Sequence, residues 1–337
     1  MSSSLLVPVT TIEKILPHNN ADSLELAQVL GWQLVVRRGE YQEGDRIVYF
    51  PIDTVLPLEL SEKFGVTKYL SKQRIKCARL RGEPSFGLAI RPEQEWEIGE
   101  NVAEYYHVEK YNPPVRATAN DAEVDHPLFT KYTDIENMRN FPDVFQVGEM
   151  VSLTEKIHGS NDRVGWIEGQ YMAGSHKLRR KEPENYASNL YWYPLSLAPV
   201  QALLTHLAGH GYRQVILYGE IYGPGVQSLQ YGQKGLGYRV FDIMTDGCYV
   251  DTTVMRDICE DFEVETVPEL ARIPYSLEAV KSYSDGKTTL MTDGAHMREG
   301  VVVKPLQERI DPKIGRCVLK YVGDTYLFGE KSDYQEV

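Results

Sequence analysis

The feature that most constrains the fold is a break in pattern about one third of the way along the chain. From Val108 to about Ala122 the sequence contains Pro113 and Pro114 and no periodic apolar positions, which is typical of a linker. The chain of 337 residues is too long for one ordinary core and long enough for two domains. We therefore expect a module over residues 1–107, a linker over 108–125 and a second domain over 126–337.

The part before the break is predicted to be a small β module. Runs of β-branched and aromatic residues, separated by turn-rich pieces, indicate strands at Trp32–Arg37, Arg46–Phe50 and Arg74–Leu80. About five short strands in roughly 100 residues suit a small barrel.

The part after the break is predicted to mix helices and strands, which places the chain in the α+β class. Apolar residues recur at helix spacing in Pro194–Gly209 and Asp251–Phe262, and more weakly in Ser276–Tyr283. Strand-like runs lie at Val215–Tyr218, Tyr238–Ile243, Val301–Lys304 and Cys317–Tyr321.

Composition excludes several classes of protein. No apolar run approaches the roughly 20 residues that span a bilayer, and Met1–Leu6 lacks the basic start of a secretory signal. The four cysteines are widely separated and have no partner at zinc spacing, which predicts free thiols rather than disulfides or a metal site. We therefore expect a cytoplasmic protein that has no membrane partner, and the sequence indicates no obligate protein partner.

A formal net charge of −12 opposes the attraction of a polyanion, so a nucleic-acid enzyme of this composition must gather its basic residues locally. Two segments meet this requirement. The predicted nucleic-acid contacts are Lys68, Lys72, Arg74, Lys76, Arg79 and Arg81 in the first, and Lys177, Arg179 and Arg180 in the second. Arg74 and Lys76 are alternate residues of a predicted strand and would share one face. The alternative for both segments is ordinary solvated surface.

The most informative segment is Thr154–Asn161, with the sequence TEKIHGSN. It lies between strand-like runs at Met150–Leu153 and Arg163–Glu168, so Lys156 is expected in a tight turn where Gly159 permits close backbone approach. A free lysine has a pKa of about 10.4 and attacks only as the neutral amine, so a nucleophilic role requires a site that lowers this pKa. The alternative is a surface hairpin with an incidental lysine.

The Lys-x-His-Gly-x-Asn pattern resembles motif I of the covalent nucleotidyltransferases, in which the lysine attacks the α-phosphorus of ATP. Segments similar to the other family motifs follow in the family's order. They are Leu217–Gly223 (motif III), Tyr238–Ile243 (motif IIIa), Arg298–Lys304 (motif IV) and Cys317–Lys320 (motif V). Gly174–Lys181 is similar to the motif Ia region. Read singly, each segment has an ordinary structural explanation, such as a core position for Phe241.

The resemblance implies a role for each matching residue. Lys156 would carry AMP, Glu220 would contact the ribose, and Phe241 would stack on adenine. Glu299 and Glu220 would bind a divalent cation, Mg²⁺ or Mn²⁺, and Lys304 and Lys320 would contact the α-phosphate. The implied ATP/AMP-binding set is Glu155, Lys156, Ile157, His158, Asn161, Ser175, Glu220, Phe241, Glu299, Lys304 and Lys320. The sequence departs from the family at Val318, which stands where motif V usually has its first lysine.

Two features distinguish an RNA ligase from the DNA ligases and capping enzymes. His158 stands where those enzymes carry aspartate, and their OB barrel follows motif V, whereas here only residues 321–337 follow Lys320. Glu13–Ala27 is similar to the HPNADxLxxA stretch of tRNA-binding OB modules, with Asn19 in place of proline. The whole chain therefore resembles the ATP-dependent RNA ligases of the Deinococcus/Naegleria type.

That resemblance implies an OB-type barrel followed by an ATP-grasp-like nucleotidyltransferase domain, with antiparallel sheets flanked by helices. It also implies the joining of 3′-OH and 5′-phosphate ends, at nicks in duplex RNA or RNA/DNA hybrids with RNA on the 3′-OH side. The rivals are a DNA ligase or guanylyltransferase of the same superfamily and a non-catalytic RNA-binding relative. A P-loop enzyme is excluded, because Gly232-Gln233-Lys234 lacks the Gly-Lys-Ser/Thr ending.

Overall fold

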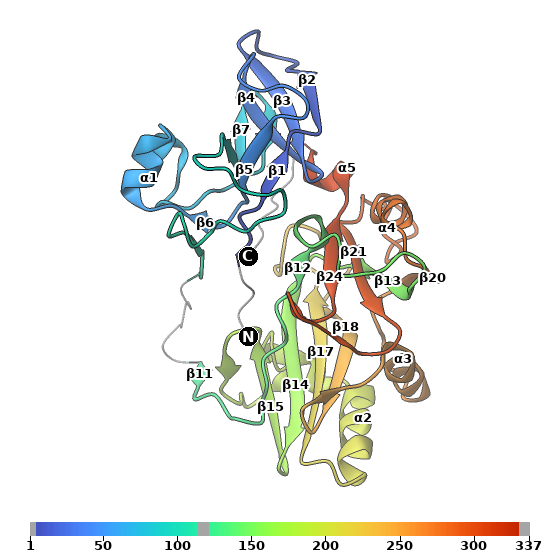
Figure 1. Ribbon diagram of the computed structural model, residues 1–337. Helices are drawn as coiled ribbons and strands as arrows, with labels where there is room; N and C mark the ends of the chain where they lie inside the picture. Colours follow the sequence, from blue (N-terminus) through green and yellow to red (C-terminus); the bar gives the residue numbers. More distant parts are fainter. Residues whose placement is uncertain (1–4, 114–120, 330–337) are drawn as a thin grey trace. The chain divides into compact units, whose positions relative to one another are not determined.

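The computed structural model describes residues 5–113 and 121–329 and divides into two compact units (Figure 1). The first unit contains the described residues up to 113, with 137–142 and 327–329. The second unit contains 121–136 and 143–326. The chain thus returns to the first unit for the short segment 137–142, where Asn140 accepts a hydrogen bond from the indole of Trp32. Residues 114–120 of the predicted linker lie outside the described residues.

The first unit is built from short antiparallel strands. Its two three-stranded sheets have the orders β1-β5-β9 and β2-β3-β4, and the pairs β6-β10 and β7-β8 complete it. The bounds are β1 Val9–Thr11, β2 Lys14–Pro17, β3 Leu24–Val29, β4 Trp32–Arg37, β5 Arg46–Phe50, β6 Thr54–Val55, β7 Ala78–Leu80, β8 Glu83–Ser85, β9 Leu88–Ile90 and β10 Glu109–Lys110. A short helix α1 (Leu58–Lys63) and a 3₁₀ turn η1 (Thr67–Tyr69) separate β6 from β7. The strands predicted at Trp32–Arg37 and Arg46–Phe50 are confirmed to the residue.

One predicted strand is wrong. The run Arg74–Leu80 forms a strand only over Ala78–Leu80, so Arg74 and Lys76 do not share a strand face. Arg74 is buried: its guanidinium forms an ion pair with the Asp53 carboxylate and lies over the ring of Tyr111 at 4.0 Å. A buried carboxylate without a partner costs folding free energy. Arg74 therefore stabilises the core by pairing with Asp53 and does not face solvent.

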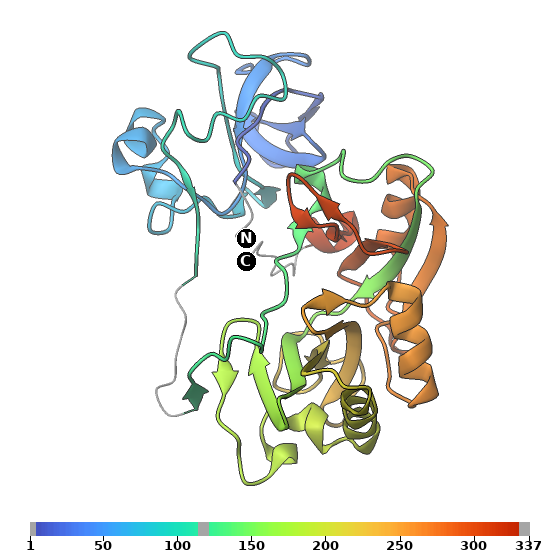
Figure 2. The ribbon, with the colours of Figure 1, turned by 60° about the horizontal axis from the view of Figure 1, so that its bottom comes forward.

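The second unit contains two larger sheets (Figures 1 and 2). The seven-stranded sheet has the order β11-β16-β15-β14-β17-β18-β19 and the five-stranded sheet the order β12-β24-β21-β13-β20. The bounds are β11 Ala122–Glu123, β12 Glu136–Asn137, β13 Met150–Lys156, β14 Ser160–Ile167, β15 Gln170–Ser175, β16 Arg179–Arg180, β17 Gln214–Tyr222, β18 Gly237–Thr245, β19 Cys248–Tyr249, β20 Glu269–Pro274, β21 Gly300–Pro305 and β24 Leu319–Val322. A separate pair joins β22 (Ile310–Asp311) to β23 (Gly315–Arg316).

Helices cover these sheets. Helix α2 (Ala198–Gly209) packs its buried leucines against β14 and β17, and α3 (Thr252–Asp261) adds Met255 and Cys259 to the same core. Helix α4 (Leu277–Ser284) lies against the five-stranded sheet. The three predicted helices are present at these positions, except that Tyr193–Ser196, ahead of α2, forms the 3₁₀ turn η4. The remaining helical pieces are η2 Met138–Asn140, η3 Tyr186–Ser188 and α5 Asp324–Leu327.

The sheets of both units are mainly antiparallel, as predicted for an α+β protein. All four cysteines are free thiols; Cys248 is exposed and Cys259 and Cys317 are buried. Within the residues that the structure describes, every helix is too short or too polar to cross a bilayer.

Candidate active site

Three neighbouring strands place the predicted nucleotide-binding lysines on one face of the five-stranded sheet. Lys156 ends β13 and pairs with Gly300 of β21. Two residues further along β21, Val302 pairs with Lys320 of β24. Because side chains alternate between faces along a strand, Lys156, Lys304 and Lys320 lie on the same face. The sequence separates these lysines by up to 164 positions, so only strand pairing brings them together.

Lys156 forms an ion pair with the predicted motif IV glutamate. Its Nζ lies 2.7 Å from Oε1 of Glu299, and Nδ1 of His158 lies 3.3 Å from the other carboxylate oxygen. Burial acts to raise the pKa of Glu299, but the Lys156 ammonium and the hydrogen bonds from His158 and Lys156 hold it at about 2. The Lys156 side chain keeps 25% of its surface exposed, whereas Glu299 keeps 6%. The lysine is therefore the accessible member of the pair.

The turn after Lys156 joins the two sheets of this unit, because β13 belongs to one sheet and β14 to the other. Gly159 lies in this turn, and a Cβ there would come within 2.3 Å of the Ile221 carbonyl oxygen and 2.9 Å of Glu220 Cγ. Only glycine fits such an approach. Asn161 and Glu220 are register partners on β14 and β17, so they share a face of the seven-stranded sheet. The predicted motif I and motif III residues thus meet at the turn.

Glu220 carries a strongly shifted pKa. Burial is the main cause, and with the nearby charge of Glu299 it raises the pKa of Glu220 to about 8, against the opposing effects of Lys156 and the Gly159 N–H. The positive charge of Lys156 therefore only partly offsets the effect of burial on this carboxylate. Strongly shifted pKa values are common at functional sites.

The predicted metal ligands Glu220 and Glu299 fit a divalent cation that arrives with substrate. Both carboxylates interact with Lys156 and with each other. Mg²⁺ and similar cations are commonly held by one or two carboxylates together with substrate phosphates and water. Among residues 5–113 and 121–329 no cluster of three or more His, Cys, Asp or Glu side chains could hold a metal alone. The donor set therefore suits a phosphate-bound cation rather than a structural metal centre.

A β-bulge aims Phe241 at the site. The register between β17 and β18 pairs Tyr218 with Asp242 and Gly219 with Val240, which leaves Phe241 as the extra residue. The bulge turns Phe241 and Asp242 to the same side, and Val240 and Ile243 remain in the core beneath α2. Bulges re-aim side chains in this way beside active sites. The partly buried Phe241 ring packs next to Ile157, which follows the nucleophile.

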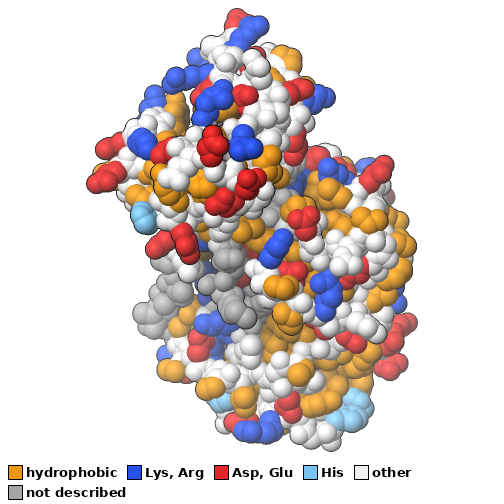
Figure 3. Space-filling model, in the orientation of Figure 1, with side chains coloured by type: hydrophobic (Ala, Val, Ile, Leu, Met, Phe, Trp, Pro, Cys, Tyr) orange, Lys and Arg blue, Asp and Glu red, His pale blue; other side chains and the backbone are white. Residues whose placement is uncertain are grey.

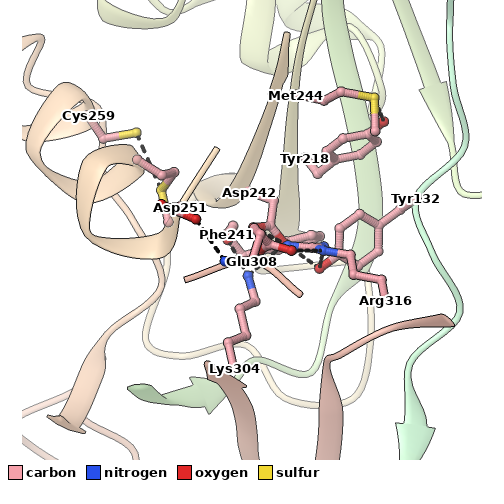
Figure 4. Close-up of polar contacts among 11 residues, drawn as sticks. Tyr132, Tyr218, Phe241, Asp242, Met244, Asp251, Cys259, Lys304, Glu308 and Arg316 are labelled. Atoms are coloured by element: carbon pink, nitrogen blue, oxygen red, sulfur yellow. Dashed lines mark hydrogen bonds and ion pairs between the residues drawn. The ribbon is translucent and has the colours of Figure 1, made fainter. Parts of the chain in front are cut away.

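The other residue of the bulge, Asp242, is the centre of a buried ionic network (Figure 4). Its carboxylate accepts hydrogen bonds from Lys304 at 2.6 Å, from two nitrogens of Arg316 at 2.9 and 3.0 Å, and from the Tyr132 hydroxyl. Arg316 also pairs with Glu308 at 2.5 Å. Burial acts to raise the pKa of Asp242, but Arg316 and Lys304 lower it to about 2. Lys304 further donates to the Phe241 carbonyl at 2.6 Å. The lysine predicted to contact phosphate is thus held by Asp242 here.

Other members of the predicted nucleotide set lie close to this site in varied surroundings. Glu155 is buried and accepts hydrogen bonds from Thr288 and Thr289, so its carboxylate anchors the loop before β21. Ser175 closes a turn with Leu178. Lys320 is buried on β24, and Val318, at the unusual motif V position, is buried between β23 and β24.

The predicted nucleic-acid contacts divide into exposed and tethered cations. Lys68, Lys72 and Lys76 are exposed in the first unit, as is Arg81. Arg79 is also exposed but donates hydrogen bonds to the carbonyls of Gly82 and Gly329. On the face shown in Figure 3, basic side chains are interspersed with acidic ones rather than gathered into one patch.

The arginines of the second basic segment form hydrogen bonds and ion pairs within the second unit. Arg180 pairs with both oxygens of Asp121 at 2.8 Å, and Arg179 donates to the Val124 carbonyl. As neighbours on β16, these two arginines point to opposite faces of the sheet. Lys177 lies half-buried in the turn before that strand.

Sequence reasoning missed three residues around the nucleophile. Asp242 directly follows Phe241 within the segment similar to motif IIIa, so its position in that motif could have identified it. Tyr231 and Ser228 contact His158 from the loop between β17 and β18, which carries no motif. No pattern along the chain could have identified them, because His158 and Tyr231 are 73 positions apart.

Comparison with known proteins agrees with this geometry. Residues 149–322 match the RNA ligase family model, and residues 6–92 match a model of an OB-fold domain. A solved Naegleria gruberi RNA ligase with PPi is 26% identical, covering 96% of this chain and 97% of its own, at a TM-score of 0.71. A lysine-to-methionine variant of that enzyme with AMP and Mn is 25% identical at a TM-score of 0.72, with coverage of 96% and 98%. No curated protein sequence matches the chain.

The ligase match covers just over half of the chain and includes Lys156, Glu220, Phe241, Glu299 and Lys320. The OB-fold match falls on the strands of the first unit. The chain therefore belongs to the family of ATP-dependent RNA ligases, with an OB-fold domain that precedes the ligase domain.

Proposed function

We propose that this ligase joins RNA 3′-OH and 5′-phosphate ends through an AMP carried on Lys156. The observation that carries the proposal is the position of Lys156: it ends a strand, is partly exposed, and contacts Glu299 beside Glu220. No other lysine combines a match to the family's nucleophile with two neighbouring carboxylates within the residues the structure describes.

The first step forms a bond between Lys156 Nζ and the α-phosphorus of ATP and breaks the bond to the β-phosphate oxygen, which leaves as pyrophosphate. Only the neutral amine attacks, so Lys156 must lose a proton and part from Glu299 before the bond forms. A divalent cation held by Glu299 and Glu220 would supply positive charge against the phosphate oxygens. Phe241, which packs against the cluster that contains Ile157, offers the adenine an aromatic surface.

In the second step the AMP passes to the 5′-phosphate of the strand, and Lys156 is released. In the third step the 3′-OH attacks that phosphate, forms the phosphodiester and displaces AMP. The N. gruberi enzyme has been solved with ATP and Mn, with AMP and Mn, and with PPi. These are the substrate and products of the reaction that we propose, which supports the same chemistry in this chain.

The OB-fold domain is the proposed RNA-binding module. Lys68, Lys72 and Lys76 are exposed, and the segment from Gly65 to Gly82 contains no acidic residue although the protein is acidic overall. The Tyr69 ring among them is 56% exposed, and aromatic rings between cations suit nucleic-acid strands. We propose that this segment contacts a nicked duplex with RNA on the 3′-OH side. Four free thiols fit a cytoplasmic enzyme.

The decisive experiment is incubation with α-³²P-labelled ATP or GTP and Mg²⁺ or Mn²⁺, followed by a denaturing gel and an acid-lability test. We expect acid-labile label from ATP on the wild type and none on Lys156→Ala. Lys313→Ala, which removes an exposed lysine of the same unit, should label normally. Label from GTP alone would indicate a guanylyltransferase, and no label from either nucleotide would indicate a non-catalytic RNA-binding relative. Sealing of all-DNA nicks as well as RNA nicks would remove the RNA preference.

A further inference from the structure

The loop between β17 and β18, residues 223–236, packs onto the turn that follows the nucleophile. Tyr231 is only 2% exposed and forms a cluster with Ile157, Tyr222 and Val267. Its ring lies 4.8 Å from that of His296, in the loop that leads to Glu299. A tyrosine on a loop with no family motif therefore reaches the centre of the site.

Two hydrogen bonds from this loop hold His158. The backbone N–H of His158 donates to the Tyr231 hydroxyl at 2.6 Å, and Ser228 Oγ lies 3.2 Å from Nε2 of the imidazole. The opposite imidazole nitrogen contacts Glu299, which in turn pairs with Lys156. A continuous series of contacts thus runs from the loop to the nucleophilic amine.

The backbone of Tyr231 supports a positional role. Its φ is +54°, a conformation that costs a non-glycine residue free energy and persists only where the surroundings enforce it. Burial also raises the pKa of the Tyr231 hydroxyl well above 10, so it remains a neutral hydrogen-bonding group across the working pH range. The strained backbone at Tyr231 places its hydroxyl against the backbone N–H of His158.

We propose that Tyr231 is a positioning residue for the adenylylation of Lys156. Its hydroxyl holds the His158 backbone, and through His158 it orients Glu299 and the Lys156 amine for in-line attack on the α-phosphorus. This inference rests on the proposed lysyl–AMP chemistry. Because Tyr231 acts through His158 rather than on the nucleotide, its loss should slow the chemical step and leave ATP binding intact.

The test compares Tyr231→Phe with Tyr193→Phe. The first keeps the ring and removes only the hydroxyl that holds His158. The second removes the hydroxyl that donates to the Leu236 carbonyl at 2.8 Å, which anchors the other end of the same loop. The rate of lysyl–AMP formation is measured over a range of ATP concentrations, together with the melting temperature of each variant. Ser228→Ala removes the second contact to His158 and serves if Tyr231→Phe does not fold.

We expect Tyr231→Phe to lower the maximal rate of lysyl–AMP formation by about tenfold with an unchanged KM for ATP, as the loss of one positioning hydrogen bond would. Tyr193→Phe should stay within about twofold of wild type, and Ser228→Ala should fall between the two.

Three results would overturn the inference. They are a wild-type rate in both Tyr231→Phe and Ser228→Ala, an equal loss in Tyr193→Phe, or a raised KM with an unchanged maximal rate. A wild-type protein that forms no lysyl–AMP would instead overturn the proposed function, and this inference with it.

Discussion

Two lysines on one face of the five-stranded sheet each form an ion pair with a carboxylate, and the two pairs look alike at first sight. Lys156 contacts Glu299 at 2.7 Å, and Lys304 contacts Asp242 at 2.6 Å. Both carboxylates have a pKa of about 2. The lysines differ in exposure, since 25% of the Lys156 side chain is exposed and only 4% of Lys304. Contact distance therefore does not distinguish the two lysines, whereas access to solvent does, and it favours Lys156 as the proposed nucleophile.

The partners of the two carboxylates explain the difference. Asp242 is fully buried and accepts hydrogen bonds from Lys304, Arg316 and Tyr132, so these residues form a closed network. Glu299 contacts Lys156 and His158 and lies beside Glu220, a carboxylate that burial makes hard to ionise. The buried network around Asp242 holds the backbone next to Phe241 in place. The Lys156–Glu299 pair is more accessible, so an incoming nucleotide can rearrange it.

The largest effect on stability is expected from Asp242→Asn. Removing the charge takes away the carboxylate that pairs with buried Lys304 and one of the two that pair with Arg316, so the free energy of unfolding should fall by about 3–5 kcal/mol. Glu299→Gln, at the open pair, should cost about 1 kcal/mol or less while it prevents the lysyl–AMP step. Denaturant unfolding followed by fluorescence measures both variants. Equal losses of stability would contradict the contrast between a closed and an open pair.

A smaller effect is expected from pH. The pKa of Asp242 is lowered in the folded state from its ordinary value of 3.8 to about 2. The folded state therefore holds this proton less tightly than the unfolded state, and stability is present above pH 4 and lost as pH falls toward 2. Glu299 contributes in the same direction. Unfolding of Asp242→Asn should show a shallower acid dependence in this window than wild type. Parallel curves for both proteins would assign the acid sensitivity to other groups.

The smallest effects are expected in the OB-fold domain, which repeats the contrast between buried and open cations. Arg74→Ala breaks the buried pair with Asp53 and should lower the melting temperature, with RNA affinity at fixed salt little changed in the protein that remains folded.

Replacement of Lys68, Lys72 and Lys76 by alanine should leave the melting temperature unchanged. It should weaken RNA binding and reduce the slope of log affinity against log salt by about 2. Fluorescence anisotropy over a salt series distinguishes Arg74→Ala from the triple lysine variant. A wild-type slope in the triple variant would show that these three lysines do not contact the RNA.

The sequence by itself determined much of this protein because its signals are local. A strand can be recognised from five or six adjacent residues, so the bounds of Trp32–Arg37 and Arg46–Phe50 were predicted to the residue. Lys156, the proposed nucleophile, and Gly159 are close neighbours in the sequence, and the family match spans the short motifs found in order along the chain. Arg74 was misjudged because its charge suggests solvent, whereas its buried partner Asp53 is 21 positions away.

Tertiary structure decided the contacts that no local pattern encodes. The bulge that turns Phe241 and Asp242 to one side depends on the register with β17, and the hydrogen bond from His158 to Tyr231 joins segments 73 positions apart. The pairing of β13 with β21 brings Lys156 to Glu299, and a contact between the two sheets brings Lys304 to Asp242. Side-chain chemistry is written in the sequence, but burial and long-range pairing set which of two similar lysines is buried in an ion pair and which remains accessible for reaction.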